Sequence, residues 1–307
     1  MKTIFLSSGQ GSFMPGMGQA EYDRIPIFRS AIDEIGNLSG EDLPSLCWGT
    51  RRNKVKNDPY LNHIVLWATN FAISKTFASV GIVPDILMGH SLGEIIAFCL
   101  SGAFSLNDAC KLIARRGKLF AENKERSDSD LIAVIGETEK LNNFMLEINS
   151  FSNVYPANFN TPIQTVFAIS NKDTETFLNK VRFTGLKAIP LKIGNGCHSP
   201  YVADIQGSLS DFIDTLDIVD PVIPVFSCVS SNLVNTAQQV REVLKKHVIS
   251  PVHWWKSLDT LANIWGNNIQ LVDLSYSNTI KGLVLGCNIK VRFVQAERLL
   301  KETVYAE

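Results

Sequence analysis

Hydrophobic and polar residues follow two different periods along the chain, and these periods predict its secondary structure. A short apolar run at residues 3–6 predicts a buried strand, and a turn-rich segment at residues 7–12 follows it. Apolar residues at helical spacing predict a helix over residues 61–77, and residues 85–88 predict the next strand. Strands that alternate with helices in this way are typical of an α/β fold.

A compact series of shorter elements follows near the middle of the chain. The pattern predicts a strand at 131–135, a helix at 138–148, strands at 154–158 and 164–169, a helix at 174–181 and a strand at 187–193. This β-α-β-β-α-β order is the ferredoxin-like arrangement. We therefore expect a small ferredoxin-like subdomain, residues 126–194, inserted into a larger α/β subdomain formed by residues 1–125 and 195–307.

The composition narrows the class of protein. The chain has 307 residues, of which 45% are hydrophobic and 19% charged, a balance that excludes a disordered or coiled-coil protein. A formal net charge of -1 gives no support for nucleic-acid or membrane-surface binding. The N-terminal apolar run is too short for a signal peptide, and polar residues such as His90 and Glu94 interrupt the apolar stretch 86–106. We therefore expect a cytoplasmic protein without a membrane span.

The six cysteines are spread widely along the chain and form no C-x-x-C pair. A zinc site, a redox pair and a disulfide framework are therefore not expected. We predict no bound metal.

One pentapeptide, Gly89-His90-Ser91-Leu92-Gly93, fits the G-x-S-x-G motif of a nucleophile elbow. The motif requires a strand before the serine and a helix after it, and the pattern predicts both, the helix over residues 94–100. The glycines leave room for the strained turn that raises the serine hydroxyl clear of the sheet. Ser91 is therefore a candidate nucleophile, and an ordinary tight turn between a strand and a helix is the alternative.

A serine nucleophile needs a base to take its proton and donors to bind the oxyanion. Backbone donors are expected at Leu92, which starts the helix, and in the Gly9-Gln10-Gly11 turn, if the first strand lies beside the elbow strand. His198 is favoured as the base, because it stands where the small subdomain returns to the large one and a cleft between subdomains is expected there. The other four histidines are expected to be structural or badly placed for this role: His63, His90, His247 and His253.

A capping-box segment, residues 105–108, opens a helix that continues to about residue 123. Arg116 falls in the middle of the apolar stripe of this helix, whereas Arg115 groups with Lys111 and Lys118 on the polar side. A guanidinium on a buried face needs a compensating anion. That anion is either a carboxylate of the protein or a carboxylate of the substrate, and snorkelling of the side chain to solvent is a third explanation.

Together these motifs resemble the malonyl-CoA:acyl carrier protein transacylase family, which includes free-standing acyltransferases that serve polyketide synthases in trans. The resemblance extends over nearly the whole chain. Its markers are Gly9-Gln10-Gly11-Ser12, Gly89-His90-Ser91-Leu92-Gly93-Glu94, Arg116-Gly117-Lys118, Asn158-Phe159-Asn160-Thr161-Pro162 with Gln164, Cys197-His198-Ser199-Pro200, and Ser250-Pro251-Val252 with Trp254.

The resemblance implies an α/β-hydrolase-like large subdomain that carries the ferredoxin-like insertion. It also implies a Ser91–His198 dyad, an oxyanion hole formed by the backbones of Gln10 and Leu92, and Arg116 as the ligand of a malonate carboxylate.

The same resemblance implies further residues of the site. A main-chain carbonyl near His247 is implied to orient the catalytic histidine, where relatives usually have glutamine. Asn62, Asn158 and Cys197 are the further candidates for the substrate pocket.

The implied enzyme is an [acyl-carrier-protein] S-malonyltransferase with a ping-pong reaction. A malonyl or related carboxylated group would pass from malonyl-CoA to Ser91, and from Ser91 to the phosphopantetheine thiol of an acyl carrier protein. The resemblance implies no bound cofactor, and we expect a monomer that binds neither nucleic acid nor membrane. An editing hydrolase that clears carrier proteins and a housekeeping transacylase of fatty-acid synthesis are the alternatives.

Overall fold

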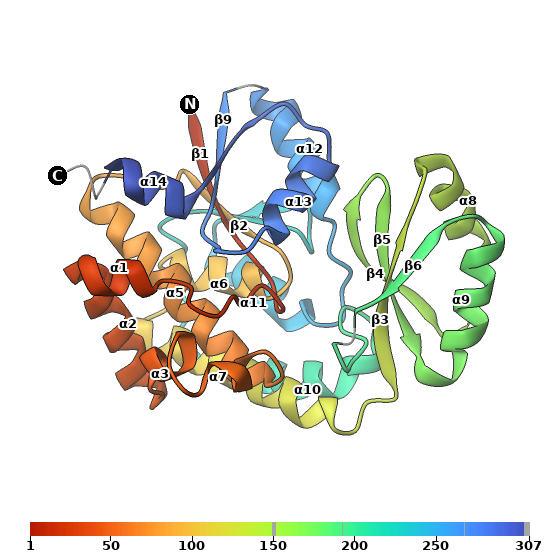
Figure 1. Cartoon of the computed structure of the whole chain (residues 1–307), viewed down its shortest axis with the longest axis horizontal. Coiled ribbons are helices and arrows are strands. Elements are labelled where there is room, and N and C mark those ends of the chain that lie inside the picture. The colour runs from red at the N-terminus through yellow and green to blue at the C-terminus, as the bar shows by residue number, and fades with distance from the viewer. Residues whose placement is uncertain (149–151, 192, 267, 304–307) are drawn as a thin grey trace.

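The computed structural model describes residues 1–148, 152–191, 193–266 and 268–303, which form two subdomains, each built on its own β-sheet (Figure 1). The larger sheet has the strand order β10-β9-β1-β2-β7-β8. Its strands are β1 (Lys2–Ser7), β2 (Ile86–Gly89), β7 (Val225–Ser227), β8 (Asn232–Val234), β9 (Ile269–Asp273) and β10 (Arg292–Gln295). Neighbouring strands are parallel except for β7 and β8, which are antiparallel.

Helices cover both faces of the larger sheet. They are α1 (Gln19–Arg24), α2 (Pro26–Ser39), α3 (Leu43–Cys47), α4 (Arg52–Val55), α5 (Pro59–Ser79), α6 (Leu92–Leu100), α7 (Leu106–Lys124), α10 (Ala203–Asp214), α11 (Ala237–Lys246), α12 (Trp254–Trp265), α13 (Thr279–Gly286) and α14 (Ala296–Thr303), with a short 3-10 turn at Pro200–Val202. Successive residues of β1 point to opposite sides, so Phe5 joins a core with α2, α5, α6 and α7, whereas Ile4 and Leu6 join a core with α12 and α13.

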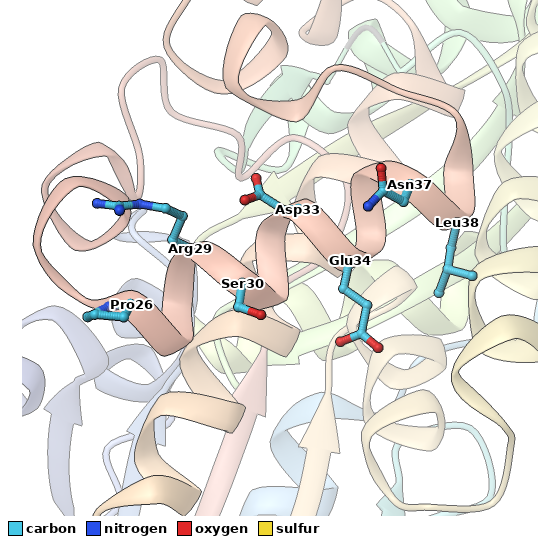
Figure 2. Close-up of a pocket in the computed structure, with 7 residues that line it drawn as sticks. All are labelled: Pro26, Arg29, Ser30, Asp33, Glu34, Asn37 and Leu38. Atoms are coloured by element: carbon cyan, nitrogen blue, oxygen red, sulfur yellow. The ribbon is translucent and has the colours of Figure 1, made fainter.

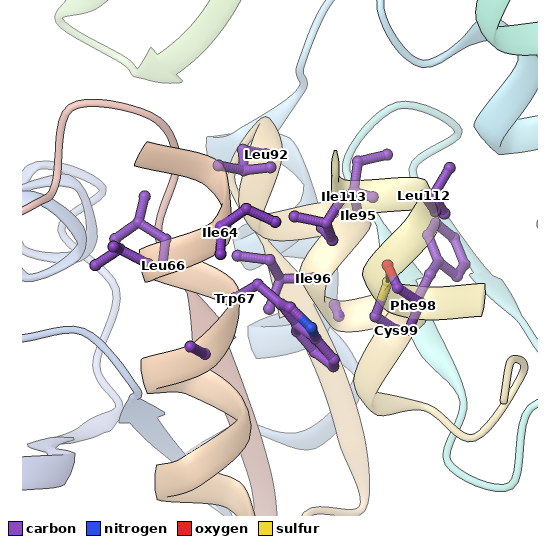
Figure 3. Close-up of a cluster of buried hydrophobic side chains, with 14 of the residues drawn as sticks. Ile64, Leu66, Trp67, Leu92, Ile95, Ile96, Phe98, Cys99, Leu112 and Ile113 are labelled. Carbon is purple, nitrogen blue, oxygen red and sulfur yellow. Dashed lines mark hydrogen bonds between the residues drawn. The ribbon is translucent and has the colours of Figure 1, made fainter. Parts of the chain in front are cut away.

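Three helices, α5, α6 and α7, pack together beside the end of β2 (Figure 3). Trp67 of α5, Ile96 of α6 and Ile113 of α7 are all buried in this cluster. The helices predicted at 61–77 and 106–123 are confirmed, and α5 has two more residues at each end than predicted. This packing holds the first turn of α6 firmly against the sheet.

The smaller sheet lies beside the larger subdomain and has the strand order β4-β5-β3-β6, with antiparallel neighbours throughout. Its elements follow the predicted β-α-β-β-α-β order: β3 (Ser129–Ile135), α8 (Thr138–Ile148), β4 (Val154–Thr161), β5 (Gln164–Ser170), a 3-10 turn (Asn171–Asp173), α9 (Thr174–Phe183) and β6 (Lys187–Pro190). The fold class, an α/β protein with a ferredoxin-like insertion, is confirmed. The subdomain limits at 126 and 194 stay a prediction.

β3 starts two residues earlier than predicted, and the ends of β4 and β6 differ from the prediction by three residues each. The last strand ends at Pro190 instead of residue 193. Leu191 still donates its N–H to the carbonyl of Leu131 at 2.9 Å, but the N–H of Ile193 bonds to the carboxylate of Asp130 at 2.9 Å instead of continuing the ladder; Lys192 lies outside the described residues. β4 continues to Thr161, beyond the predicted end at 158, through two register shifts that break the alternation of its side chains. The irregular end of β4 bonds to the larger subdomain, since Phe159 donates its N–H to the carbonyl of Val252 at 2.8 Å.

A hollow of about 670 Å³ runs along the outer face of α2 (Figure 2). It is lined by Pro26, Arg29, Ser30, Asp33, Glu34, Asn37 and Leu38. Arg29 donates to the backbone carbonyls of Tyr22 and Asp23, and Asp33 accepts from the Tyr22 hydroxyl, so both charged side chains form hydrogen bonds within the protein. None of the sequence motifs with candidate catalytic or binding residues lies in this hollow. In the described part of the chain, no helix has the length and apolar character needed to cross a membrane.

Candidate active site

The elbow motif forms a sharp turn between β2 and α6. Ser91 has φ 53° and ψ −119°, a backbone conformation that residues with a side chain rarely adopt. The turn depends on glycine at both flanks: a Cβ on Gly89 would lie 2.0 Å from the carbonyl carbon of Gly93, and one on Gly93 would lie 2.0 Å from the carbonyl oxygen of Ser7. This strained geometry is that of a nucleophile elbow and not of an ordinary tight turn.

Ser91 and His198 form a direct pair. Oγ of Ser91 lies 2.8 Å from Nε2 of His198, although 107 residues separate them in the sequence. On the other side of the ring, Nδ1 lies 2.9 Å from the carbonyl oxygen of Ser250 and 3.2 Å from that of His247. Because carbonyl oxygens only accept hydrogen bonds, Nδ1 carries the proton and Nε2 is free to take the serine proton.

The surroundings keep His198 neutral. Burial and the nearby positive charge of Arg116 lower the pKa of His198 to about 3, and the bonds to the carbonyls of Ser250 and His247 offset this only in part. The imidazole is therefore unprotonated at neutral pH, which is the state that a general base needs.

The loop after β1 lies directly against the elbow, because β1 and β2 are neighbouring parallel strands. A Cβ on Gly9 would lie 2.8 Å from the carbonyl oxygen of His90 and 3.4 Å from the Cβ of Ser91. Gln10, the next residue of this loop, lines the same cavity as Ser91. Leu92 is the first residue of α6, so its N–H has no acceptor within the helix. Both residues expected to bind the oxyanion thus stand next to the elbow.

Arg116 lies on the buried face of α7, as its place in the apolar stripe predicts. It is 1% exposed, so snorkelling does not explain it. No Asp or Glu within the described ranges has a carboxylate oxygen within 4.0 Å of the guanidinium, so no internal salt bridge compensates its charge. The guanidinium lies over the ring of Phe120 at 4.3 Å and lines the same cavity as Ser91 and His198.

A histidine of α5 contacts the guanidinium. Nη1 of Arg116 lies 3.0 Å from Nε2 of His63, and Nε of Arg116 is buried without a hydrogen-bond partner among the described residues. Burial lowers the pKa of Arg116 to about 10, which leaves it charged at neutral pH. The sequence predicted only a packing or capping role for His63.

These residues meet in a cavity of about 280 Å³ that is lined by residues of both subdomains. Its polar lining includes Ser91, His198, Arg116 and Gln10. Its apolar lining comes mainly from the smaller sheet and the segment after β6: Leu131, Ala133, Ile135, Val166, Ile189, Leu191 and Ile193. An apolar lining with a few polar groups is typical of a small-molecule site.

The predicted pocket residues divide into two groups. Asn158 and Cys197 line the cavity. Asn62 is not among the lining residues; it is 2% exposed, its Oδ1 has no partner in the described part of the chain, and its role in the pocket stays a prediction. Consecutive helical residues point about 100° apart, and on α5 it is His63 that faces Arg116.

A polar chain beside the serine was missed from the sequence. Nε2 of His90 lies 2.8 Å from Oδ1 of Asn160, and Nδ2 of Asn160 donates to Oε1 of Gln164 at 2.8 Å. All three line the cavity. The family markers include Asn160 and Gln164, but the bulged end of β4, which brings them to His90, has no signal in the sequence pattern.

Ionisable groups around the site have shifted pKa values. Burial lowers the pKa of four side chains that we call the buried histidines, namely His63, His90, His198 and His247. Burial raises the pKa of two side chains that we call the buried carboxyls, Glu94 and Asp273, to about 7. Over the described residues, no group of three or more His, Cys, Asp and Glu side chains is placed to hold a metal ion.

An elbow serine that is hydrogen-bonded to a neutral histidine defines an α/β enzyme with a serine nucleophile. Residues 4–264 match the family model described as "Acyl transferase domain". The chain belongs to the acyl transferase domain family.

Known proteins are similar over most of this chain. The malonyl CoA-acyl carrier protein transacylase of Bacillus subtilis is 29% identical, over 95% of this chain and 92% of that protein. The polyketide biosynthesis protein ThaF of Burkholderia thailandensis is 30% identical, over 81% of this chain and 21% of that protein. The non-reducing polyketide synthase pgmA of Aspergillus terreus is 25% identical, over 93% of this chain but only 13% of the synthase. The resemblance to malonyl transacylases is thereby confirmed.

Solved structures show the same fold. MCAT from Streptococcus pneumoniae superposes with a TM-score of 0.88 at 25% identity, over 98% of this chain and 99% of that one. A malonyl-transacylase solved with a type II PKS acyl-carrier protein superposes with a TM-score of 0.90 at 22% identity, over 99% of this chain and 100% of that one. The two-subdomain architecture is therefore that of malonyl transacylases.

Proposed function

We propose that this enzyme transfers a malonyl group from coenzyme A to the phosphopantetheine thiol of an acyl carrier protein, through an acyl-enzyme on Ser91. The observation that carries this proposal is the Ser91–His198 pair in one cavity with Arg116, a buried cation that has no acidic partner among the described residues. The similarity to malonyl transacylases supports it.

In the first half-reaction, Oγ of Ser91 attacks the thioester carbonyl while Nε2 of His198 takes the hydroxyl proton. The oxyanion that forms accepts hydrogen bonds from the backbone N–H groups of Gln10 and Leu92. When the tetrahedral intermediate collapses, the carbon–sulfur bond breaks and His198 returns the proton to the departing coenzyme A thiolate. The carbonyls of Ser250 and His247 hold the Nδ1–H throughout, so the ring keeps the orientation that the proton transfers need.

In the second half-reaction, the phosphopantetheine thiol of the carrier protein takes the place of coenzyme A. His198 accepts the thiol proton, the thiolate attacks the acyl-serine, and the same oxyanion donors stabilise the second tetrahedral intermediate. The proton then returns to Oγ of Ser91, which restores the enzyme.

Arg116 supplies the substrate specificity. Its guanidinium binds the free carboxylate of the malonyl group through charge-assisted hydrogen bonds. An editing hydrolase for uncharged acyl chains would gain nothing from a buried cation without an acid partner, which is why transfer of a carboxylated group is the favoured function.

We further propose that the enzyme serves a polyketide synthase in trans, in the cytoplasm, as a monomer and without a resident cofactor. Similarity to ThaF and to the acyltransferase regions of polyketide synthases supports the pathway, whereas similarity to the Bacillus protein keeps housekeeping fatty-acid synthesis as the alternative. Transfer rates to carrier proteins from each pathway, measured side by side, distinguish the two.

The central test is the intact mass of the protein after incubation with malonyl-CoA. We expect one malonyl adduct on the wild type, none on Ser91→Ala, and loss of the adduct when a phosphopantetheinylated carrier protein is added. An adduct that persists in Ser91→Ala would refute the assignment of the nucleophile. Release of free acid faster than transfer to any carrier protein would favour the editing hydrolase.

A further inference from the structure

A neutral acceptor, and not an acid, orients Arg116. Nη1 of Arg116 lies 3.0 Å from Nε2 of His63, and both side chains are buried. A guanidinium only donates hydrogen bonds, so Nε2 is the unprotonated nitrogen of His63 and the ring proton is on Nδ1. His63 is therefore neutral and holds the guanidinium without cancelling its charge.

The position of the His63 ring is fixed by close packing between α5 and α7. A Cβ on Gly117 would lie 2.8 Å from the Cα of Tyr60 and 3.2 Å from Nδ1 of His63, so only glycine allows this approach of the two helices. The ring of Phe120 lies 5.9 Å from the His63 ring and also lies beneath the guanidinium of Arg116. The imidazole and the guanidinium are thus held against one aromatic ring.

Gln10 connects this pair to the catalytic loop. Its Oε1 is placed 3.3 Å from the same Nε2 of His63. Since Nε2 is unprotonated, the amide of Gln10 bonds to it only when its NH₂ group points to the ring. The side chains of Arg116 and Gln10 therefore both lie next to one acceptor, Nε2 of His63.

The neutrality of the acceptor has a consequence for binding. A carboxylate at position 63 would form an ion pair with Arg116 and would leave little net charge for a ligand. With imidazole as the acceptor, Arg116 keeps its full charge, and its Nε still has no partner among the described residues. Both features favour a ligand that brings its own carboxylate.

We propose that His63 is a positioning residue that sets the preference for carboxylated acyl groups, by orienting Arg116 while leaving it a cation. This inference rests on the proposed transacylase function. The direction of its pKa agrees, because burial and the charge of Arg116 hold the pKa of His63 well below its usual range.

Binding in the Ser91→Ala background tests the inference separately from the chemistry. The affinities for malonyl-CoA and acetyl-CoA are measured by isothermal titration for Ser91→Ala alone and combined with His63→Leu, His63→Gln or His63→Glu. Leucine removes the acceptor, glutamine keeps a neutral acceptor, and glutamate keeps an acceptor but adds a charge. We expect His63→Leu to weaken malonyl-CoA binding by about 10- to 100-fold and to leave acetyl-CoA binding unchanged.

The glutamine and glutamate variants have nearly the same shape and differ in charge. Their comparison therefore tests whether a neutral acceptor at position 63 is needed for malonyl-CoA binding, even if His63→Leu does not fold. We expect His63→Gln to restore most of the malonyl-CoA affinity and His63→Glu to lose it, with acetyl-CoA binding the same in both. Equal behaviour of the two variants, or an equal loss for both CoA esters, would overturn the inference.

A double substitution shows whether His63 acts through Arg116. If it does, His63→Leu causes no further loss of malonyl-CoA affinity once Arg116→Met is present. A full additional loss in that background would mean that His63 acts only on the structure. A wild type that forms no acyl-enzyme refutes the proposed function alone, whereas a Ser91→Ala protein without any preference for malonyl-CoA refutes this inference.

Discussion

Replacing Arg116 by alanine separates binding of the substrate carboxylate from the chemistry of the serine. Arg116 touches neither nitrogen of His198 and does not belong to the elbow, so Ser91 keeps its base and its oxyanion donors in this variant. Malonyl-CoA loses the partner of its carboxylate, whereas acetyl-CoA has no carboxylate to lose. We expect malonyl transfer to fall and acetyl transfer to stay constant or to rise.

The burial of Arg116 sets the size of the effect. Removing one partner from a buried, hydrogen-bonded charge pair costs about 3–5 kcal/mol. At about 1.4 kcal/mol for each factor of ten, kcat/KM for malonyl-CoA should fall by about 10² to 10³ or slightly more. A solvent-exposed arginine would lose about 1 kcal/mol or less, which is a factor of about five at most.

The assay is the rate of acyl transfer from radiolabelled malonyl-CoA and acetyl-CoA to one carrier protein. Arg115→Ala is the matched control, since it removes the same side chain from the next position of α7, where the residue is partly exposed and does not line the cavity. Arg116→Met keeps the packing over Phe120 if the alanine variant unfolds. Equal losses for the two substrates would show that Arg116 is structural and would refute the reasoning.

Because the pKa of His198 is lowered to about 3, the acylation rate of the free enzyme should stay flat from neutral pH to about pH 5; an inflection near the usual histidine pKa in single-turnover rates would contradict this. The buried histidines, which outnumber the buried carboxyls, take up protons on unfolding below about pH 6.5, whereas the buried carboxyls release them. The free energy of unfolding should therefore fall as the pH falls from 6 to 5, and urea titrations that show a rise would be inconsistent with it. Gly9→Ala places a Cβ 2.8 Å from the carbonyl oxygen of His90, so the catalytic loop must shift and kcat for both CoA esters should drop by about tenfold or more. Gly207→Ala, which has open space around its Cβ on α10, is its control, and unchanged kcat in Gly9→Ala would exclude a role of this loop in the oxyanion hole.

Local patterns predict most of the fold and the elbow. Two helices were predictable, at 61–77 and 106–123, and so was the order of helices and strands along the smaller subdomain. Each of these elements depends on the period of a single segment. The ends of β4 and β6 were not predictable, since β4 continues through two register shifts and the carboxylate of Asp130 takes the N–H of Ile193 beyond the end of β6. These ends matter, because the bulge of β4 carries Asn158 and Asn160 into the cavity.

The candidate site was predictable where a motif or a periodicity carries it. The motif around Ser91 predicts the strained turn that presents its hydroxyl to the cavity, and the stripe on α7 predicts that Arg116 is buried. The partner of Arg116 was not predictable, because His63 lies 53 residues away on another helix and looks like any packed histidine in the sequence. Only the structure shows that this histidine contacts Arg116.

The acceptors that orient the catalytic groups share one property: none of them is an acid. Backbone carbonyls hold Nδ1 of His198, and an imidazole holds Arg116. A carboxylate in place of the carbonyls would stand in the same small cavity as Arg116 and would compete with the substrate for its charge. In the described residues, no Asp or Glu lines this cavity, so Arg116 is the fixed charge that an acyl group meets there. In the proposed function, orientation by neutral acceptors therefore lets the same site act both as a base-assisted nucleophile and as a selective binder of carboxylated acyl groups.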